Sequence, residues 1–254
     1  FGGLESIVRN VNRKARNLRF FEVGNVYHFD EERYTTESPI KAYQQRYHLA
    51  LWVTGRRVEG NWAHPDEESS FFELKAYVEN VLRRVGLQAG QVVTEASDNN
   101  IFDKGLRMKT RGGKVLVDMG IVNHHVLRRF DIEQPVYYAE IDWTELMKAT
   151  RKNSLLFQEL SKYPAVSRDL ALLVDANVEF AQIEQIARQT EKKLLKQVVL
   201  FDVYQGKNLP EGKKSYAVNF ILQDESRTLI DKAIDAIMQK LMKNLTTKLH
   251  AELR

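Results

Sequence analysis

Residues 196–223, KQVVLFDVYQGKNLPEGKKSYAVNFILQ, contain two runs in which apolar and polar side chains alternate. The runs are KQVVLFDVYQG (196–206) and SYAVNFILQ (215–223), and both are rich in β-branched and aromatic residues. Alternation with a period of two is typical of a strand that is buried on one face. Gly206 at the end of the first run, with Pro210 and Gly212 between the runs, favours a turn. The stretch therefore predicts two neighbouring strands joined by a loop.

The loop GKNLPEGKKS (206–215) has some features of a phosphate-binding loop, G-x-x-x-x-G-K-[ST]. However, five residues rather than four separate Gly206 from Gly212, and a second Lys precedes Ser215. A phosphate-binding loop must also open a helix, whose N-terminus binds the phosphates. Because a strand follows here, we predict that this loop does not bind ATP.

The flanking segments complete a small α+β domain. RDLALLVD (168–175) is predicted as a strand and EFAQIEQIARQT (179–190) as a helix. A long amphipathic helix follows from Thr228, which forms a predicted capping box with Asp231. The terminal AELR (251–254) is expected to close the sheet as a fourth strand. The order β-α-β-β-α-β is that of a ferredoxin-like fold.

One face of this predicted sheet is expected to be open, because both helices cover the other face. Alternation places Val199, Phe201 and Val203 on one face and Asp202 and Tyr204 on the other. An exposed Tyr can stack on an RNA base, and a carboxylate can accept hydrogen bonds from the N1–H and N2–H₂ edge of an unpaired guanine. Alternatively, the Tyr rests on the sheet and the Asp caps a turn, and the sequence leaves both readings open.

The first half of the chain reads as a separate α+β domain. The polar stretch RKNSLLFQELSKYP (151–164) marks the junction, so we predict two domains, residues 1–153 and 154–254. In the first domain, helices are predicted over residues 4–16, 71–87 and 144–150, strands over 18–29, 47–55 and 135–143, and a hairpin over 105–120.

Composition limits the chemistry. The chain has no Cys, which excludes disulfides, thiolate zinc sites and Cys nucleophiles. His124 and His125 are adjacent, so on a helix they point about 100° apart, and His64 has no second His at zinc spacing. No Gly-x-Ser-x-Gly or His-Glu-x-x-His motif occurs. We therefore expect no catalytic residue and no metal site.

The 254 residues carry a net charge of +4, which is shared equally by the two predicted domains. This charge is too small to indicate nucleic-acid binding by itself, so any such binding must rest on local patches. No apolar run approaches the ~20 residues that span a bilayer. The chain begins with FGGLES rather than Met, and we expect it to be a piece of a larger protein.

The second half resembles the ferredoxin-fold anticodon-binding domain that ends the beta subunits of bacterial phenylalanine–tRNA ligases. The resemblance lies in SKYPAVSRDLALLVD, LFDVYQG, EGKKSYAVNFILQ, SRTL and the terminal ELR. In the first half, LESIVRNVNRKARNLRFFEVGNVY, FFELKAYVENVL and YYAEIDWTELM resemble, in order, the catalytic-like module of the same subunits. Two stretches depart from the family pattern: His124-His125 replaces a frequent His-Pro, and NNIFDKGLRMK (99–109) lacks a His-Pro-Gly-Arg-like motif.

The resemblance implies a part of a cytoplasmic α2β2 class II aminoacyl-tRNA synthetase, which charges phenylalanine tRNA with the use of ATP and Mg²⁺. It implies that the catalytic alpha subunit holds the chemistry. The first domain would share the antiparallel class II sheet, lack an active site and pack on alpha. The piece itself would then be non-catalytic and hold no cofactor.

The family's anticodon contacts fall on Tyr204, which would stack on the first anticodon base, on Asp202, which would accept from that guanine, and on Ser215, which would bond a neighbouring base. Lys213 and Lys214 at the loop, and Arg168 and Arg227 at strand and helix ends, are our own candidates for phosphate contacts. The alternative function is a ferredoxin-like module that recognises a small ligand or a protein, as this fold often does.

Overall fold

The computed structural model describes residues 1–154 and 159–253. It divides into two compact units, residues 1–156 and 157–254, and each unit is described by itself. The predicted domain boundary at 153/154 lies next to residues 155–158, which are outside the described residues, and it stays a prediction.

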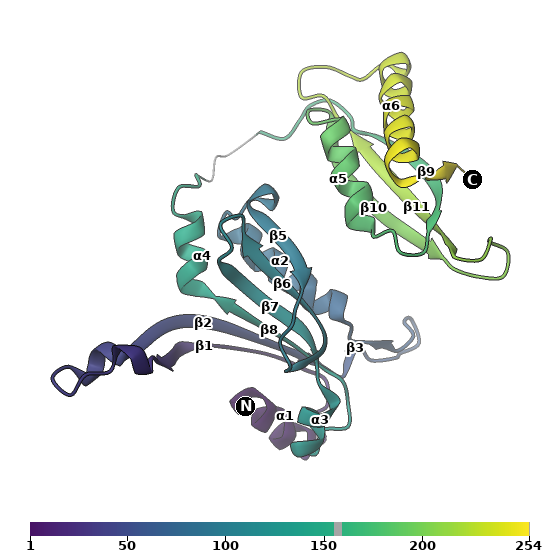
Figure 1. The fold of residues 1–254 in the computed structure, drawn as a ribbon. Helices are drawn as coiled ribbons and strands as arrows, with labels where there is room; N and C mark the ends of the chain where they lie inside the picture. The colour runs from purple at the N-terminus through teal and green to yellow at the C-terminus, as the bar shows by residue number, and fades with distance from the viewer. Residues whose placement is uncertain (155–158, 254) are drawn as a thin grey trace. The chain divides into compact units, whose positions relative to one another are not determined.

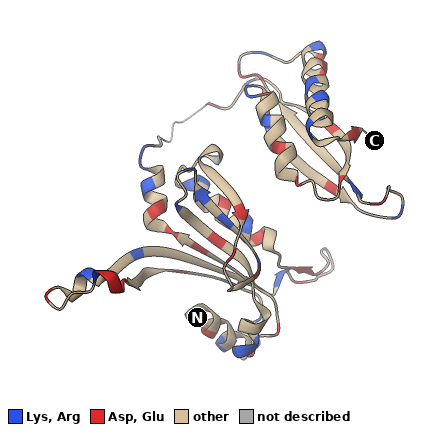
Figure 2. Ribbon diagram, viewed as in Figure 1, with Lys and Arg blue, Asp and Glu red and all other residues tan. Residues whose placement is uncertain are grey.

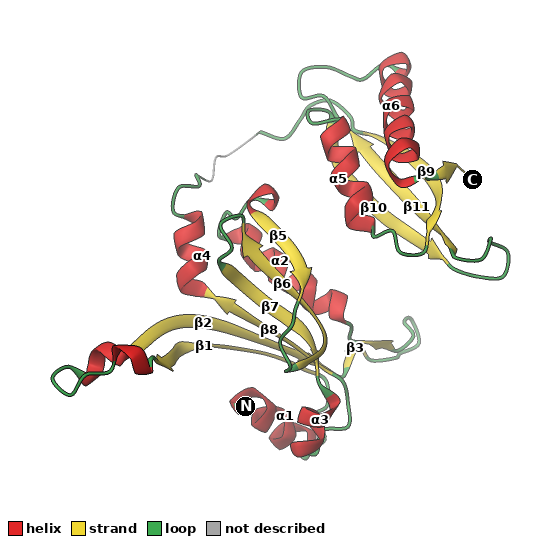
Figure 3. Cartoon of the chain, in the orientation of Figure 1, coloured by secondary structure: helices red, strands yellow, loops and turns green. Residues whose placement is uncertain are grey.

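A six-stranded sheet forms the centre of the first unit (Figures 1 and 3). The strand order is β1-β2-β8-β7-β6-β5, and each neighbouring pair is antiparallel. The strands are β1 (Leu18–Phe29), β2 (Tyr43–Thr54), β5 (Val92–Ala96), β6 (Phe102–Thr110), β7 (Val115–Val122) and β8 (Val136–Asp142), with β3 (Arg56–Val58) and β4 (Glu67–Glu68) as a separate hairpin. The antiparallel sheet that the resemblance implies is therefore present, and the short strand β5 was not predicted from the sequence.

Four α-helices accompany this sheet in the described part of the first unit. They are α1 (Gly2–Val11), α2 (Phe71–Arg84), α3 (His124–Arg129) and α4 (Trp143–Thr150), and short 3₁₀ turns cover Glu31–Arg33, Pro39–Ala42 and Ala89–Gln91. The Ser70 side chain begins α2 by accepting a hydrogen bond from the Glu73 backbone N–H. Leu74 and Val78 of α2 are fully buried in one core with Val117 and Ile141 of the sheet. Helix α2 therefore covers one face of the sheet.

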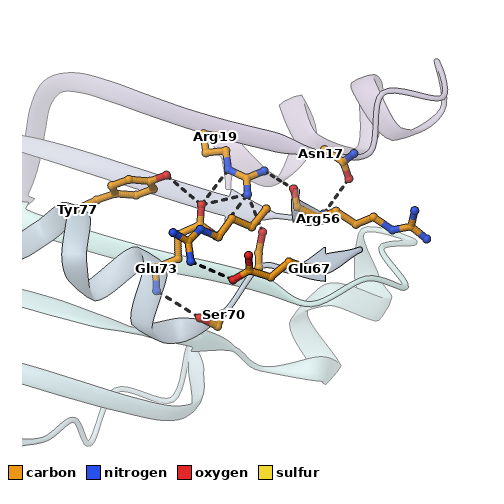
Figure 4. A network of polar contacts seen from close by, with 9 residues as sticks. Asn17, Arg19, Arg56, Glu67, Ser70, Glu73 and Tyr77 are labelled. Carbon is orange, nitrogen blue, oxygen red and sulfur yellow. Dashed lines mark hydrogen bonds and ion pairs between the residues drawn. The ribbon is translucent and has the colours of Figure 1, made fainter. Parts of the chain in front are cut away.

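A polar network fixes α2 against the first strand (Figure 4). The Arg19 guanidinium of β1 donates to Glu73 at 3.0 Å, to the Ser69 hydroxyl at 2.9 Å and to the Arg56 carbonyl at 2.8 Å. Tyr77, one turn further along α2, donates to the same carboxylate at 2.9 Å. The Glu73 side chain is only 5% exposed, so these donors compensate for the burial of its charge.

Helix α1 packs at one end of the sheet, in a second core that includes Leu4, Ile7 and Trp52. A Cβ atom at Gly3 would overlap the Trp52 ring, so the helix approaches the sheet closely only because this residue is glycine. The predicted extension of this helix to Arg16 is wrong. The helix ends at Val11, and Lys14 has a positive φ of 71°, which a continuing helix does not allow.

The second unit has the predicted ferredoxin-like order: β9 (Val166–Asp175), α5 (Phe180–Thr190), β10 (Leu195–Tyr204), β11 (Lys213–Leu222), α6 (Asp231–Leu249) and β12 (Glu252–Leu253). The sheet order is β10-β11-β9-β12, with all pairs antiparallel. The expectation that the terminal residues add a fourth strand is confirmed. Val218 and Phe220 of β11 pack with Ile183 of α5 and Leu241 of α6, so both helices cover one face of the sheet.

Two local predictions for this unit are wrong. A β-bulge at Phe201 separates the pairs Leu200↔Val218 and Asp202↔Ala217, so Val199 and Val203 lie on opposite faces rather than on one. The predicted capping box does not form either, because α6 begins at Asp231 after Ile230, with no side-chain cap. The capping box of this unit lies at α5, where Glu179 and Gln182 bond reciprocally.

Candidate nucleic-acid interface

The face of the second sheet that points away from α5 and α6 is the candidate interface. Residues paired across antiparallel strands share a face, so the strand registers define it. Its members are Gln197, Val199, Asp202 and Tyr204 of β10, Lys213, Ser215, Ala217, Asn219 and Ile221 of β11, Ser167, Asp169, Ala171, Leu173 and Asp175 of β9, and Glu252 of β12. We call this set the open face.

The three predicted base-contacting residues come together on the open face. Tyr204 is paired with Ser215, and Asp202 is paired with Ala217, the next position on the same face. The bulge at Phe201 lies before both pairs, so Asp202 and Tyr204 still share a face, about 7 Å apart along the strand. Tyr204 is 38% exposed and lies in the edge strand, whereas Ser215 in the inner strand is 8% exposed. The Tyr204 ring and the Asp202 carboxylate therefore lie beside the less exposed hydroxyl of Ser215.

The loop between the two strands supports Tyr204. A Cβ atom at Gly206 would lie 2.6 Å from the Tyr204 hydroxyl oxygen, so the ring leans over the backbone of this glycine. Two turns shape the loop, with Leu209 N–H donating to Gly206 O and Lys213 N–H donating to Pro210 O, both at 3.1 Å. Strand β11 follows the loop, so the predicted strand after it is confirmed, and the absence of ATP binding at this loop stays a prediction.

Lys213 lies on the open face but is engaged by two carboxylates. Its ammonium group is 3.1 Å from Asp175 Oδ1 and 3.6 Å from Glu252 Oε1, which ties β11 to β9 and β12. The hydrogen bond to Asp175 is the main cause that raises the pKa of Lys213 above its ordinary value. A phosphate would have to compete with both carboxylates for this cation.

The other three candidate phosphate contacts do not join Tyr204. Lys214 is 8% exposed on the helix-covered face, where its ammonium group lies 4.8 Å from the Tyr216 ring centroid. The structure does not bring the two lysines together, because consecutive strand residues point to opposite faces, and their contacts with phosphate stay a prediction. Arg168 is paired with Phe220 of the covered face and lies 3.6 Å from Asp231. Arg227 donates to Asp224 at 3.2 Å in the segment that follows the C-terminal end of β11, whereas Ser215 lies near the N-terminal end of that strand.

The charge of the open face is a feature that the sequence did not indicate. It carries four carboxylates, on Asp169, Asp175, Asp202 and Glu252, and one cation, on Lys213. Asp169 accepts from Asn219 and Asp175 pairs with Lys213, so both are already engaged. No ion pair reaches Asp202 within residues 1–154 and 159–253. The face suits hydrogen-bond donors of a ligand better than phosphates.

The first unit contains a polar cavity of about 400 Å³ beside strands β2, β7 and β8. Its charged lining groups are largely paired: His48 Nδ1 lies 2.8 Å from Glu140, and Arg46 donates to Asp142 at 3.0 Å. Asp118, also in the lining, accepts from Arg107 at 2.8 Å. The lining has neither a hydroxyl nor a thiol nucleophile. These residues do not form a base–nucleophile pair.

The adjacent histidines do not diverge as predicted. The ring centroids of His124 and His125, at the start of α3, are 3.9 Å apart, and Asp103 lies 3.3 Å from His124 Nδ1. Neither this pair nor any other part of the described chain groups three His, Cys, Asp or Glu residues around a metal-sized space. No helix in the described ranges is long and apolar enough to span a membrane.

Comparison with known proteins gives matches over both units. Residues 1–143 match the phenylalanyl tRNA synthetase beta chain CLM domain, and residues 161–254 match the ferredoxin-fold anticodon binding domain. The chain is 57% identical over 254 residues to a phenylalanine–tRNA ligase beta subunit of Bacteroides thetaiotaomicron, with 100% of this chain and 31% of that relative covered.

Beta subunits of the same ligase from two more distant organisms are also similar. The relative from Porphyromonas gingivalis is 49% identical, with 100% of this chain and 31% of the relative covered. The relative from Syntrophotalea carbinolica is 35% identical, with 99% of this chain and 30% of the relative covered. The chain thus spans about a third of the length of these relatives. Among solved structures, pyrrolysyl-tRNA synthetase from Desulfitobacterium hafniense gives a TM-score of 0.41 at 14% identity over 59% of this chain and 48% of that one, a likeness too low to assign a fold.

Proposed function

Because the chain belongs to the family of phenylalanine–tRNA ligase beta subunits, we propose that it acts within such a ligase as its anticodon-reading and subunit-packing part. In this proposal the second unit binds the anticodon stem-loop of phenylalanine tRNA. The first unit packs on a catalytic alpha subunit in an α2β2 assembly. Aminoacylation then takes place on alpha, in the cytoplasm.

The observation that carries the proposal is the gathering of Tyr204, Asp202 and Ser215 at one end of the open face. The exposed Tyr204 ring offers a surface for the first anticodon base, a contact that tolerates any base. Asp202, two residues away, accepts only, so it selects the two donors on the Watson–Crick edge of guanine. Ser215 both donates and accepts, which suits a neighbouring base. Stacking thus supplies affinity and the carboxylate supplies specificity.

Packing on alpha is supported by the ribbon of β1 and β2, which projects from the first unit (Figure 1). The ribbon exposes apolar side chains that a solvated surface does not require, among them Phe21 (74%), Tyr27 (64%), Phe29 (52%), Tyr43 (57%) and, in the turn that precedes β2, Ile40 (82%). Burial of such a stripe by another subunit would remove it from water.

ATP and Mg²⁺ are assigned to the alpha subunit in this proposal. Two sites among the described residues were candidates, and neither fits: the loop 206–212 leads into a strand rather than a helix, and the charged lining of the first unit's cavity is largely paired. The chain would contribute binding and orientation of tRNA, and no step of the chemistry.

The test is binding of the chain to a labelled anticodon stem-loop of phenylalanine tRNA. Tyr204→Ala should weaken binding by about 2 kcal/mol, because base–aromatic stacking contributes about 1–3 kcal/mol per base. Tyr163→Ala is the matched control, because Tyr163 is a similarly exposed tyrosine of the same unit that lies before β9. Equal binding by wild type and Tyr204→Ala would exclude the stacking role.

The acidic open face favours one rival function, recognition of a cationic small ligand or a basic protein segment. Stem-loop binding, measured beside binding of an oligolysine peptide, distinguishes the anticodon role from this rival function. RNA binding that depends on Tyr204 supports the anticodon role, whereas no binding to the stem-loop together with binding to an oligolysine peptide supports the rival.

A further inference from the structure

Four exposed lysines lie on the helical side of the second unit, on either side of a contact between α5 and α6. The Asn244 side chain of α6 donates to the Thr190 hydroxyl at 2.8 Å, which ties the end of α5 to the second half of α6. Lys192 and Lys193 follow Thr190 by two and three residues. Lys240 precedes Asn244 by one helical turn, and Lys243 is its neighbour. Figure 2 shows basic residues along α6. We call these four residues the lysine cluster.

All four side chains are exposed, and none makes an ion pair in the described ranges, residues 1–154 and 159–253. Two carboxylates at α5 have other partners. Glu191 accepts from the backbone N–H groups of Lys193 and Leu194, both at 2.9 Å, and Glu184 pairs with Arg188 at 2.8 Å. The ammonium groups of the cluster therefore form no ion pair in the described ranges.

Helix dipoles account for only part of this arrangement. Cations are stabilising near helix C-termini, which explains Lys248 in the last turn of α6 and favours Lys192 and Lys193 after α5. The effect is confined to the terminal turns, so it does not explain Lys240 or Lys243 in the body of a 19-residue helix.

We propose that the lysine cluster binds the phosphate backbone of RNA without reading its bases, as a second RNA contact distinct from the open face. Lys240 and Lys243 are three residues apart on a helix, with Cβ atoms about 5–6 Å apart, so their ammonium groups reach neighbouring phosphates. Lysine is depleted at protein–protein interfaces and frequent at phosphate contacts, which favours RNA over an acidic protein.

The proposal also supplies what the open face lacks. Backbone phosphates dominate RNA affinity and its salt dependence. The open face carries four carboxylates and a single lysine that is already paired, so it is poorly suited to this electrostatic contribution. In this proposal the lysine cluster supplies affinity for the RNA backbone and the open face recognises bases. The lysine cluster is therefore an additional contact beyond the anticodon contacts proposed above.

The test uses the chain and a blunt RNA duplex of about 20 base pairs, which has no unpaired base for Tyr204 or Asp202. Binding is measured as the salt concentration is raised from 50 to 300 mM. The double variant Lys240→Ala/Lys243→Ala should make the slope of log K against log salt shallower by about 2, because each lost phosphate contact removes about 1. The matched control, Lys207→Ala/Lys232→Ala, removes the same charge from two other exposed lysines of the unit and should keep the slope.

Thermal melting of both double variants establishes that they fold. Equal slopes for the two double variants would show that net charge alone binds the duplex and would overturn the proposal. It would also be overturned if wild type did not bind the duplex, or if polyglutamate bound at the cluster in its place. Tyr204→Ala should retain duplex binding while its binding to the stem-loop weakens, so failure of the anticodon role and failure of the lysine cluster are distinguishable.

Discussion

The two sheets of the chain use charged side chains in different ways. In the first sheet, Arg107 bonds Asp118 at 2.8 Å and Asp98 at 2.5 Å, and His48 meets Glu140 at 2.8 Å. Arg107 and Asp118 are 18% and 14% exposed. In the second sheet, Asp202 lies exposed at the edge of the open face. Charges that are paired and nearly buried stabilise the fold, whereas an exposed acceptor gains energy only when a ligand brings donors.

Asp118→Asn should give the largest stability effect. The substitution leaves the guanidinium of Arg107 with only Asp98 in a mostly buried site, and broken buried pairs cost about 3–5 kcal/mol. Because both partners are slightly exposed, we expect a loss of about 2–3 kcal/mol in the free energy of unfolding. Urea titration measures it. Asp202→Asn is the matched control and should change stability by less than about 0.5 kcal/mol, and similar losses in both variants would break the comparison.

Gly206→Ala should weaken RNA binding with little effect on the fold. A methyl group at this position would lie 2.6 Å from the Tyr204 hydroxyl, so the ring must turn away from its place on the open face. We expect a loss of about 1 kcal/mol in stem-loop binding, at the lower end of the stacking range, because the ring is displaced rather than removed. Fluorescence anisotropy measures it, and an affinity equal to wild type would show that the orientation of the ring is unimportant.

Asp224→Asn should give the smallest effect, and one that depends on pH. The Ser226 hydroxyl and backbone N–H, followed by Arg227, lower the pKa of Asp224 below 3.8. A depressed pKa contributes stability above the unfolded value of 3.8, and that contribution is lost as pH falls through the folded pKa. The melting temperature of wild type should therefore exceed that of the variant at pH 6, and the difference should shrink towards pH 3.

Much of the fold was predictable from local patterns. Strand β1 was predicted at its observed bounds, 18–29, and the order of the second unit followed from alternation and helical spacing. The short elements β5 and α3 were not predicted, because five or six residues are too few to show a clear periodicity. The helix predicted to Arg16 failed, because a regular apolar spacing continued past the residue where the backbone turns at Lys14.

The candidate site was predictable in its faces but not in its charges. Asp202, Tyr204 and Ser215 were expected together and lie together, even though the bulge at Phe201 shifts the residues before them. The sequence placed the cation of Lys213 near RNA, but the two carboxylates that engage it come from β9 and β12, which lie 38 and 39 residues away along the chain. Pairing between distant strands is set by register, which periodicity does not encode.

The central claim is that Asp202 reads the donor edge of an unpaired guanine beside Tyr204. The direct measurement is binding of the chain to two anticodon stem-loops, one with guanine as the first anticodon base and one with inosine, which lacks the N2–H₂ donor. Wild type should bind the inosine form more weakly by about 2 kcal/mol, since hydrogen bonds to charged groups contribute about 1.5–3 kcal/mol. Asp202→Ala should bind both forms equally. Equal binding of the two forms by wild type, or discrimination that survives in Asp202→Ala, would contradict the account.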